Sequence, residues 1–146
     1  MIFSVPADAP DDYAALMDWK NKENWREKFN VDEAWVKDFE IVPIINVPGY
    51  GDACAPLLCE QFKVGTHKEK DKLTLCKGEA YKKGFYTGVM TAGPFKGLPV
   101  PEAKDKTKAY LVEKGEAMIY YEPEKEVMSR SGCECVVALC DQWLKR

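Results

Sequence analysis

Apolar residues recur at helical spacing near the start of the chain. Between residues 12 and 28 the large apolar side chains fall mainly on one face of a helix, and the charged side chains lie on the other faces. Pro10 suits the entry to this helix, and Asp11 is its predicted N-cap, contributing about 1 kcal/mol. Before the helix, residues 2–5 form a short apolar run that we interpret as the end of a strand.

Four further helical segments follow from the same spacing. They are residues 33–37, 53–62, 67–82 and 101–114. Asp32 is the predicted cap of the first segment, which buries Trp35, and Thr66 with Glu69 forms a capping box for the third. Gly84 is predicted to end that third helix. The positions expected to face inward are Leu57, Leu58, Phe62, Leu73, Cys76, Ala80 and Tyr81.

Short strand-like runs lie between and after these helices. They occupy residues 41–47, 85–91, 117–121, 127–131 and 134–139. Pro43 cannot donate a backbone hydrogen bond, so the first run is an edge strand or an irregular one. No internal repeat or low-complexity tract is present. The sequence therefore predicts an α/β fold with a mixed sheet of short strands and several helices.

Length and charge narrow the possibilities further. A chain of 146 residues is long enough for one domain with a real core. Its net charge of -3 gives no overall attraction to nucleic acid. The charge is uneven, because residues 63–83 carry seven lysines against three acidic side chains. A solvated helix face is the favoured interpretation of that segment, and contact with a phosphate backbone is the alternative.

Six cysteines raise the question of disulfides or a metal site. Cys54 and Cys59 would point to different faces of a helix, and Cys133 with Cys135 forms C-x-C rather than C-x-x-C. We therefore predict no metal site and small buried thiols in a reduced protein. No signal peptide and no apolar run of about 20 residues is present, which predicts a soluble cytoplasmic protein without a membrane partner.

Common catalytic motifs are absent from the sequence. There is no G-x-S-x-G, no Walker A and no G-x-G-x-x-G pattern, and His67 is the single histidine. What remains is an acidic cluster, Asp8, Asp11 and Asp12, at a strand-to-helix junction. Carboxylates at helix starts mostly serve as caps, but one held on a rigid loop can also do chemistry. Asp12 is the candidate for such a role.

Two blocks of the sequence resemble a known family. Residues 4–12, S-V-P-A-D-A-P-D-D, resemble the S-V-P-x-D-x-P-D-D motif in the editing domain of eukaryotic and archaeal cytosolic leucyl-tRNA synthetases. Residues 128–143, M-S-R-S-G-C-E-C-V-V-A-L-C-D-Q-W, resemble the strands by which that inserted domain returns to the catalytic body. Shorter matches at residues 42–45, 48–51, 83–90 and 95–97 fall in the family's order, so the resemblance covers essentially the whole chain.

The resemblance implies connective peptide 1 of a class I synthetase, which hydrolyses tRNA(Leu) mischarged with near-isosteric amino acids. One methylene is worth only about 1–3 kcal/mol of discrimination, so a second, hydrolytic sieve is needed. In this family the last aspartate of the motif, here Asp12, binds the α-ammonium of the mischarged amino acid. Val5 and Pro6 then line the pocket, and Asp8 and Asp11 are further substrate-binding candidates. A positioned water attacks the ester without a covalent nucleophile or a cofactor.

The sequence also departs from the family's pattern. A G-T-G-V segment, a threonine-rich loop and the H-x-G-H and K-M-S-K-S signatures are absent from it. We therefore expect a partial editing domain over residues 1–146, with a eukaryote-type insertion at 20–83 and returning strands at 127–146. ATP with Mg is implied for the full-length enzyme only, and the isolated chain is expected neither to charge tRNA nor to edit efficiently. The expected partners are mischarged tRNA(Leu) and the rest of the synthetase.

Two other classes of function stay open at this point. The chain could be a non-catalytic module that caps the pocket or contacts tRNA or a protein, with Lys77, Lys82 and Lys83 as candidate nucleic-acid contacts. It could also be a structural fragment with no activity of its own.

Overall fold

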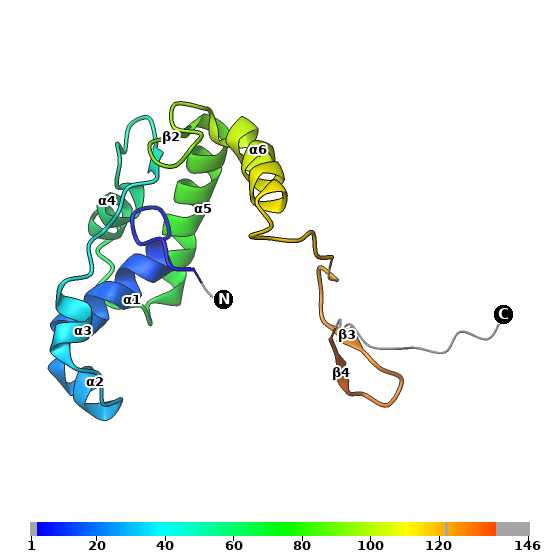
Figure 1. Ribbon diagram of the computed structural model, residues 1–146. Helices are drawn as coiled ribbons and strands as arrows, with labels where there is room; N and C mark the ends of the chain where they lie inside the picture. The colour runs from blue at the N-terminus through cyan, green and yellow to red at the C-terminus, as the bar shows by residue number, and fades with distance from the viewer. Residues whose placement is uncertain (1–2, 122, 137–146) are drawn as a thin grey trace. The chain divides into compact units, whose positions relative to one another are not determined.

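The computed structural model describes residues 3–121 and 123–136 (Figure 1). The chain divides into two compact units, residues 1–110 and residues 111–146. The elements in chain order are α1 (Pro10–Asn21), α2 (Glu23–Lys28), α3 (Glu33–Lys37), β1 (Ile45–Asn46), α4 (Cys54–Gln61), α5 (Lys70–Thr87), β2 (Val89–Met90), α6 (Val100–Glu113), β3 (Val127–Met128) and β4 (Glu134–Cys135). Within the described ranges, no helix combines the length and apolar character needed to cross a membrane.

The core of the first unit lies where α1, α4 and α5 pack against one another (Figure 1). Leu58 of α4 and Leu73 and Cys76 of α5 are fully buried there, as their helical spacing predicted. Leu57 and Tyr81 were expected to face inward, but they are 47% and 51% exposed. Each sits next to a buried residue, Leu58 or Ala80, on a helix that packs along a single narrow face.

The predicted helix over residues 12–28 is two helices. Lys22 has an extended backbone, with φ -110° and ψ 93°, and separates α1 from α2. Trp25 and Phe29 pack against Trp19 across this break, with ring centroids 5.5 and 5.8 Å from that of Trp19. The apolar residues that seemed to continue one helical face therefore form an aromatic cluster at a corner.

The prediction that Asp11 caps α1 is wrong. The residue before the helix is Ala9, no side chain caps the first turn, and Pro10 is the first helical residue. Proline is suited to that position because its fixed φ is helical and it has no N–H to satisfy. The predicted cap of α3 is confirmed, since the carboxylate of Asp32 accepts a hydrogen bond from Ala34 N at 2.9 Å. Trp35 on α3 is 65% exposed, so its predicted burial is wrong.

The boundaries of α5 also differ from the prediction. The helix begins at Lys70 and runs through Gly84 to Thr87, taking residues that were assigned to a strand. Gly84 therefore does not stop the helix; it is buried within α5, where a Cβ would make an ordinary contact with Val47 Cγ2 at 3.9 Å. The capping box is not formed, since Glu69 instead accepts a hydrogen bond from Gly65 N at 2.7 Å. By contrast, α6 matches its predicted range within one residue.

The described strands form two antiparallel pairs. Ile45 of β1 lies opposite Met90 of β2, and Val127 of β3 lies opposite Cys135 of β4. The α/β prediction is confirmed, although each strand is shorter than its apolar run. Residues 3–5 and 117–121 are not strands. Residues 137–139 of the last predicted strand lie outside the described residues, and the proposed insertion and returning strands stay predictions.

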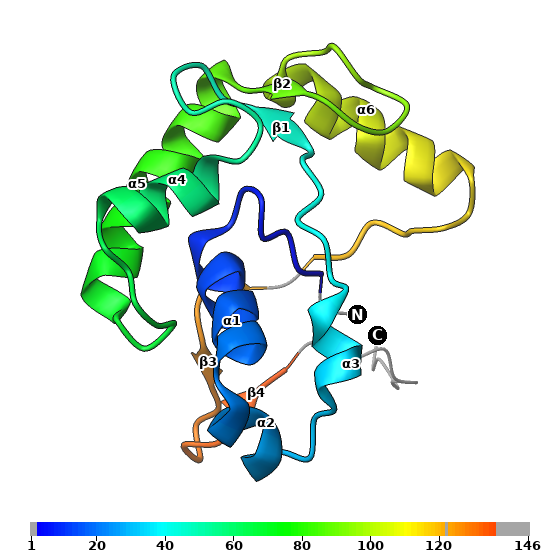
Figure 2. The same cartoon turned by 90° about the vertical axis from the view of Figure 1, so that its left-hand side faces the viewer.

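A segment without regular structure, residues 38–44, connects α3 to β1. Figure 2 shows it running past α1 and the N-terminal loop before it reaches β1. Lys20 Nζ on α1 donates a hydrogen bond to the carbonyl of Phe39 at 2.5 Å, which holds this segment against the helix. The path of residues 38–44 matters because it forms one side of the candidate site.

Candidate functional site

A tight loop leads into α1 and carries the acidic cluster. The carbonyl of Val5 accepts hydrogen bonds from the backbone N–H groups of Asp8 (3.0 Å) and Ala9 (2.9 Å), which closes the loop before Pro10 starts the helix. Asp11 and Asp12 therefore fall in the first turn of α1. The partial positive charge of a helix N-terminus favours carboxylates at these positions.

The side chain of Asp12 contacts the loop that precedes α1. Its Oδ2 accepts a hydrogen bond from Val5 N at 2.7 Å. Among the described residues this is the only hydrogen-bond donor to Asp12, so its Oδ1 can take another partner. The short bond fixes the carboxylate relative to Val5 and Pro6, the residues that the sequence placed in one site with it.

A groove of about 540 Å³ lies beside Asp12. The loop and α1 form one side of it, and the segment around residues 36–44 forms the other. Apart from Ser4, Asp12 and Glu40, the described residues that line it are apolar: Val5, Pro6, Ala15, Leu16, Trp19, Val36, Phe39, Val42 and Ile44. A groove of this kind can hold an aliphatic group while the carboxylate binds a cation.

The structure brings Val5, Pro6 and Asp12 together in this groove, and their role in substrate binding stays a prediction. The sequence did not indicate Trp19, Phe39 or Ile44, because they come from separate parts of the chain. Of the three, only Ile44 belongs to an apolar run, residues 41–47; Trp19 and Phe39 each stand between charged residues.

Asp8 is directed elsewhere. It lines a second pocket, of about 330 Å³, to which Asp12 does not contribute. Neither of its carboxylate oxygens has a hydrogen-bond partner among the described residues. Burial raises the pKa of Asp8 to about 6, and the nearby backbone N–H of Ile44 offsets only part of that effect.

Two of the three candidate lysines on α5 form ion pairs, and one of these pairs includes Asp11. Asp11 Oδ2 forms an ion pair with Lys77 Nζ at 2.9 Å, and neither residue lines the Asp12 groove. Lys83 pairs with Glu79 at 3.0 Å and donates a hydrogen bond to Tyr50 Oη at 3.1 Å. Lys82 is exposed. A role for these lysines in nucleic-acid binding stays a prediction.

Comparison with known proteins identifies the chain. No protein-family profile matches it. Over 143 residues, 98% of the chain, it is 50% identical to the cytoplasmic leucine–tRNA ligase of Arabidopsis thaliana and 46% identical to that of Pongo abelii. The crystal structure of the P. falciparum cytosolic leucyl-tRNA synthetase editing domain matches 83% of the chain with a TM-score of 0.75 and 30% identity.

The chain belongs to the cytosolic leucyl-tRNA synthetase family. Within that family it corresponds to part of the editing domain, which confirms the resemblance found in the sequence. The chain spans 12% and 13% of the length of the Pongo and Arabidopsis ligases, and 40% of the P. falciparum editing domain.

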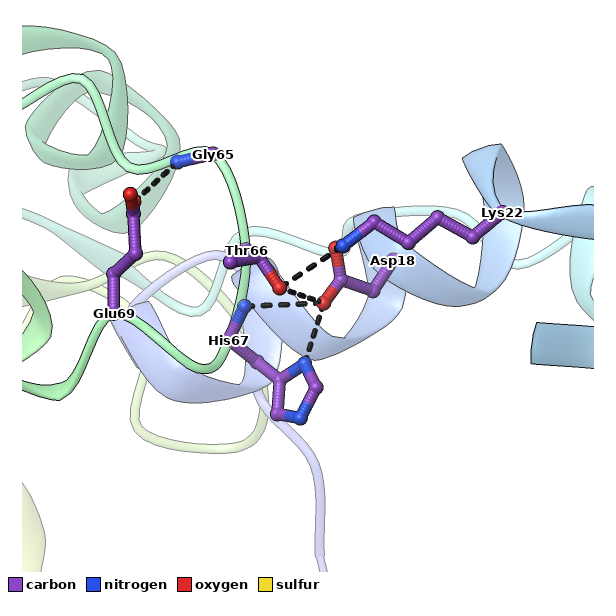
Figure 3. A network of polar contacts seen from close by, with 6 residues as sticks. All are labelled: Asp18, Lys22, Gly65, Thr66, His67 and Glu69. Atoms are coloured by element: carbon purple, nitrogen blue, oxygen red, sulfur yellow. Dashed lines mark hydrogen bonds and ion pairs between the residues drawn. The ribbon is translucent and has the colours of Figure 1, made fainter. Parts of the chain in front are cut away.

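One polar site in this synthetase fragment was missed from the sequence. Asp18 on α1 is only 3% exposed and accepts hydrogen bonds from Thr66 Oγ1 (2.7 Å) and His67 N (3.1 Å), as Figure 3 shows. Its other oxygen pairs with Lys22 Nζ at 2.6 Å, and the His67 ring nitrogen Nδ1 also contacts the carboxylate. Trp25 packs edge-on against the His67 ring at 4.6 Å. Thr66, expected to cap a helix, thus ties the loop before α5 to α1.

The electrostatics of Asp18 follow from these contacts. Burial would raise its pKa, but the hydrogen bonds from Lys22, His67 and Thr66 outweigh burial and hold the pKa of Asp18 well below its usual range. The carboxylate is therefore ionised at neutral pH and acts as a structural link. The spacing of Asp18 and Lys22, four residues apart on a helix, was the only sequence signal for it.

The cysteines divide into two groups. Cys54, Cys59 and Cys76 are buried in the helical core of the editing-domain fragment, as predicted for small hydrophobes, whereas Cys133 and Cys135 are exposed. Burial raises the pKa of Cys54 to about 11 and that of Cys59 to about 12, so these thiols stay protonated at neutral pH. Within residues 3–121 and 123–136, no group of three or more His, Cys, Asp or Glu side chains is placed to hold a metal ion.

Proposed function

We propose that this chain supplies one wall of the hydrolytic site that removes mischarged amino acids from tRNA(Leu). The observation that carries the proposal is the position of Asp12. Its carboxylate is fixed by Val5 N at 2.7 Å, at the edge of a groove that is otherwise mostly apolar. The membership of the chain in the leucyl-tRNA synthetase family supports the choice of reaction.

In the proposed chemistry, one charged contact and one apolar contact hold the aminoacyl group. The α-ammonium of the aminoacyl group pairs with Asp12, and its aliphatic side chain lies along the apolar lining of the groove. This anchoring fixes the ester carbonyl so that a positioned water can attack it. A hydrolytic sieve of this kind is useful because binding alone discriminates aliphatic side chains by only about 1–3 kcal/mol per methylene.

The partners and location belong to the same proposal. The substrate is the 3′ end of mischarged tRNA(Leu), and the rest of the synthetase completes the groove. The relatives carry the name cytoplasmic, and we place this enzyme in the cytoplasm as well. We assign no cofactor to the hydrolysis, while ATP with Mg would serve the aminoacylation reaction of the full-length enzyme.

The test replaces Asp12 in the full-length synthetase. Hydrogen bonds to charged groups contribute about 1.5–3 kcal/mol, so Asp12→Ala should lower kcat/KM for deacylation of mischarged tRNA(Leu) by about 10- to 100-fold. Asp12→Asn keeps an oxygen acceptor for Val5 N and should lose almost as much activity. Leucylation of tRNA(Leu), measured in parallel, should stay unchanged.

A surface aspartate provides the matched control. Asp71 is exposed in the first turn of α5 and does not line the groove. Asp71→Ala should deacylate mischarged tRNA(Leu) within about twofold of the parental enzyme, since such surface changes cost little. Parental deacylation by Asp12→Ala would contradict the proposal.

A further inference from the structure

The two walls of the Asp12 groove are held in different ways. One wall is the N-terminal loop with α1, and the helical residues in it share one face of α1, spaced over two turns: Asp12, Ala15, Leu16 and Trp19. The other wall comes from residues 36–44, and residues 38–44 of it form no helix or strand (Figure 2). The position of this second wall therefore depends on contacts from neighbouring elements.

Few hydrogen bonds hold the second wall in place. At its end, the carbonyl of Ile44 accepts a hydrogen bond from Thr91 N at 2.9 Å. Among the described residues, only one hydrogen bond joins residues 38–44 to α1, and it runs from Lys20 Nζ to the carbonyl of Phe39 at 2.5 Å. Phe39 lines the groove and Lys20 does not. Lys20 can thus hold this wall without occupying the space for the substrate.

The backbone of Lys20 is itself fixed by Arg26 of α2. Arg26 Nη1 donates hydrogen bonds to the carbonyls of Lys20 and Trp19, each at 2.9 Å. Arg26 is only 9% exposed, and its Nη2 lies 3.8 Å from Glu33 Oε2 in the first turn of α3, the helix that leads into the second wall. These contacts hold the last turn of α1, so Lys20 connects the second wall to a well-anchored part of the first.

We propose that Lys20 is a positioning residue that sets the width of the Asp12 groove and thereby its preference for one size of aliphatic side chain. This inference rests on the proposed function, because it takes the groove as the site of the aminoacyl side chain. Apolar walls attract a side chain only while both stay in contact with it, and they exclude an extra methylene only while they cannot separate. Without the hydrogen bond from Lys20, residues 38–44 can move away from α1 and a larger side chain fits.

The first experiment measures how firmly the second wall is held in the full-length synthetase. Chymotrypsin cleaves after Phe39 only when the Phe39 carbonyl can enter the oxyanion hole of the protease, so the hydrogen bond from Lys20 should protect this bond. Lys20→Met keeps an aliphatic stem without a donor, and chymotrypsin should cleave it after Phe39 about three- to tenfold faster. Lys20→Arg restores a donor and should be cleaved there at close to the parental rate.

The second experiment compares deacylation of valyl-tRNA(Leu) and leucyl-tRNA(Leu), whose side chains differ by one methylene. The ratio of kcat/KM for the valyl ester to that for the leucyl ester should fall about three- to tenfold in Lys20→Met and return in Lys20→Arg. A loss of stability alone would lower both rates and leave the ratio unchanged. The control is Lys70→Met, since Lys70 is exposed on α5 and does not line the groove; it should match the parent in both experiments.

Two results would overturn the proposal. The first is an unchanged rate of cleavage after Phe39 in Lys20→Met. The second is faster cleavage with an unchanged ratio of the two esters, because the second wall would then not control the size preference. Failure of the proposed function is a separate result, since it appears as parental deacylation of mischarged tRNA(Leu) by Asp12→Ala.

Discussion

Replacement of Asp18 by alanine is expected to lower the free energy of unfolding by about 2–4 kcal/mol. The variant removes a carboxylate that is 3% exposed and leaves Lys22, Thr66 and His67 without their common acceptor. The loss should lie below that of a fully buried ion pair, because the side chains of Lys22 and His67 are 35% and 27% exposed. Urea unfolding of the parent and the variant at pH 7 measures the difference.

The pH dependence of this loss provides an internal check. The folded-state pKa of Asp18 lies below its unfolded value, so its stabilising effect is present above about pH 4 and disappears as the pH falls through the folded-state pKa. The difference in free energy of unfolding between the parent and Asp18→Ala should therefore narrow as the pH is lowered from 4 toward 2. A loss below about 0.5 kcal/mol at pH 7, the size expected for the surface control Asp71→Ala, would contradict the role given to Asp18.

Replacement of Gly88 by alanine is expected to cost about 3 kcal/mol or more. Gly88 is buried directly after α5, where a Cβ would lie 2.2 Å from the carbonyl oxygen of Gly84 and 2.6 Å from Ile45 Cγ2. The first neighbour is backbone and cannot rotate away, so the end of α5 or strand β1 must shift. Urea unfolding of Gly88→Ala at pH 7 checks this expectation.

The same helix contains a matched control. Gly78 lies inside α5, and a Cβ there would meet no atom within 4 Å. Gly78→Ala should therefore raise the stability by up to about 1 kcal/mol, through helix propensity alone. A similar small effect at both glycines would show that β1 and the end of α5 do not pack as described.

Local patterns in the sequence predicted the helical core well. Leu58, Leu73 and Cys76 are buried as their spacing implied, and α6 ends just before Gly115. The errors occurred where a tertiary contact decides the structure. Gly84 looked like a helix stop, yet α5 continues through it to Thr87, and Gly84 is buried beside Val47. A local pattern carries no information about such a neighbour.

In the candidate site, too, local sequence patterns located some residues, while tertiary contacts decided where others lie. The motif at residues 4–12 located Asp12, Val5 and Pro6, but only the fold shows that Asp8 lines a different pocket from Asp12. The direction in which each side chain of a tight loop points depends on the backbone hydrogen bonds that close the loop, and not on the residue types. Here the carbonyl of Val5 accepts those hydrogen bonds. Asp18 was missed because its partners, Thr66 and His67, lie almost 50 residues further along the chain.

The central claim is that Asp12 binds the α-ammonium of the mischarged amino acid. The most direct measurement compares two esters of tRNA(Leu) in the full-length synthetase, one with an aliphatic α-amino acid and one with its α-hydroxy analogue. The parental enzyme should deacylate the α-amino ester at least tenfold faster, because only that ester carries the cation. Asp12→Asn should deacylate both at similar, slow rates. A preference for the α-amino ester that survives in Asp12→Asn would place the ammonium anchor on another residue.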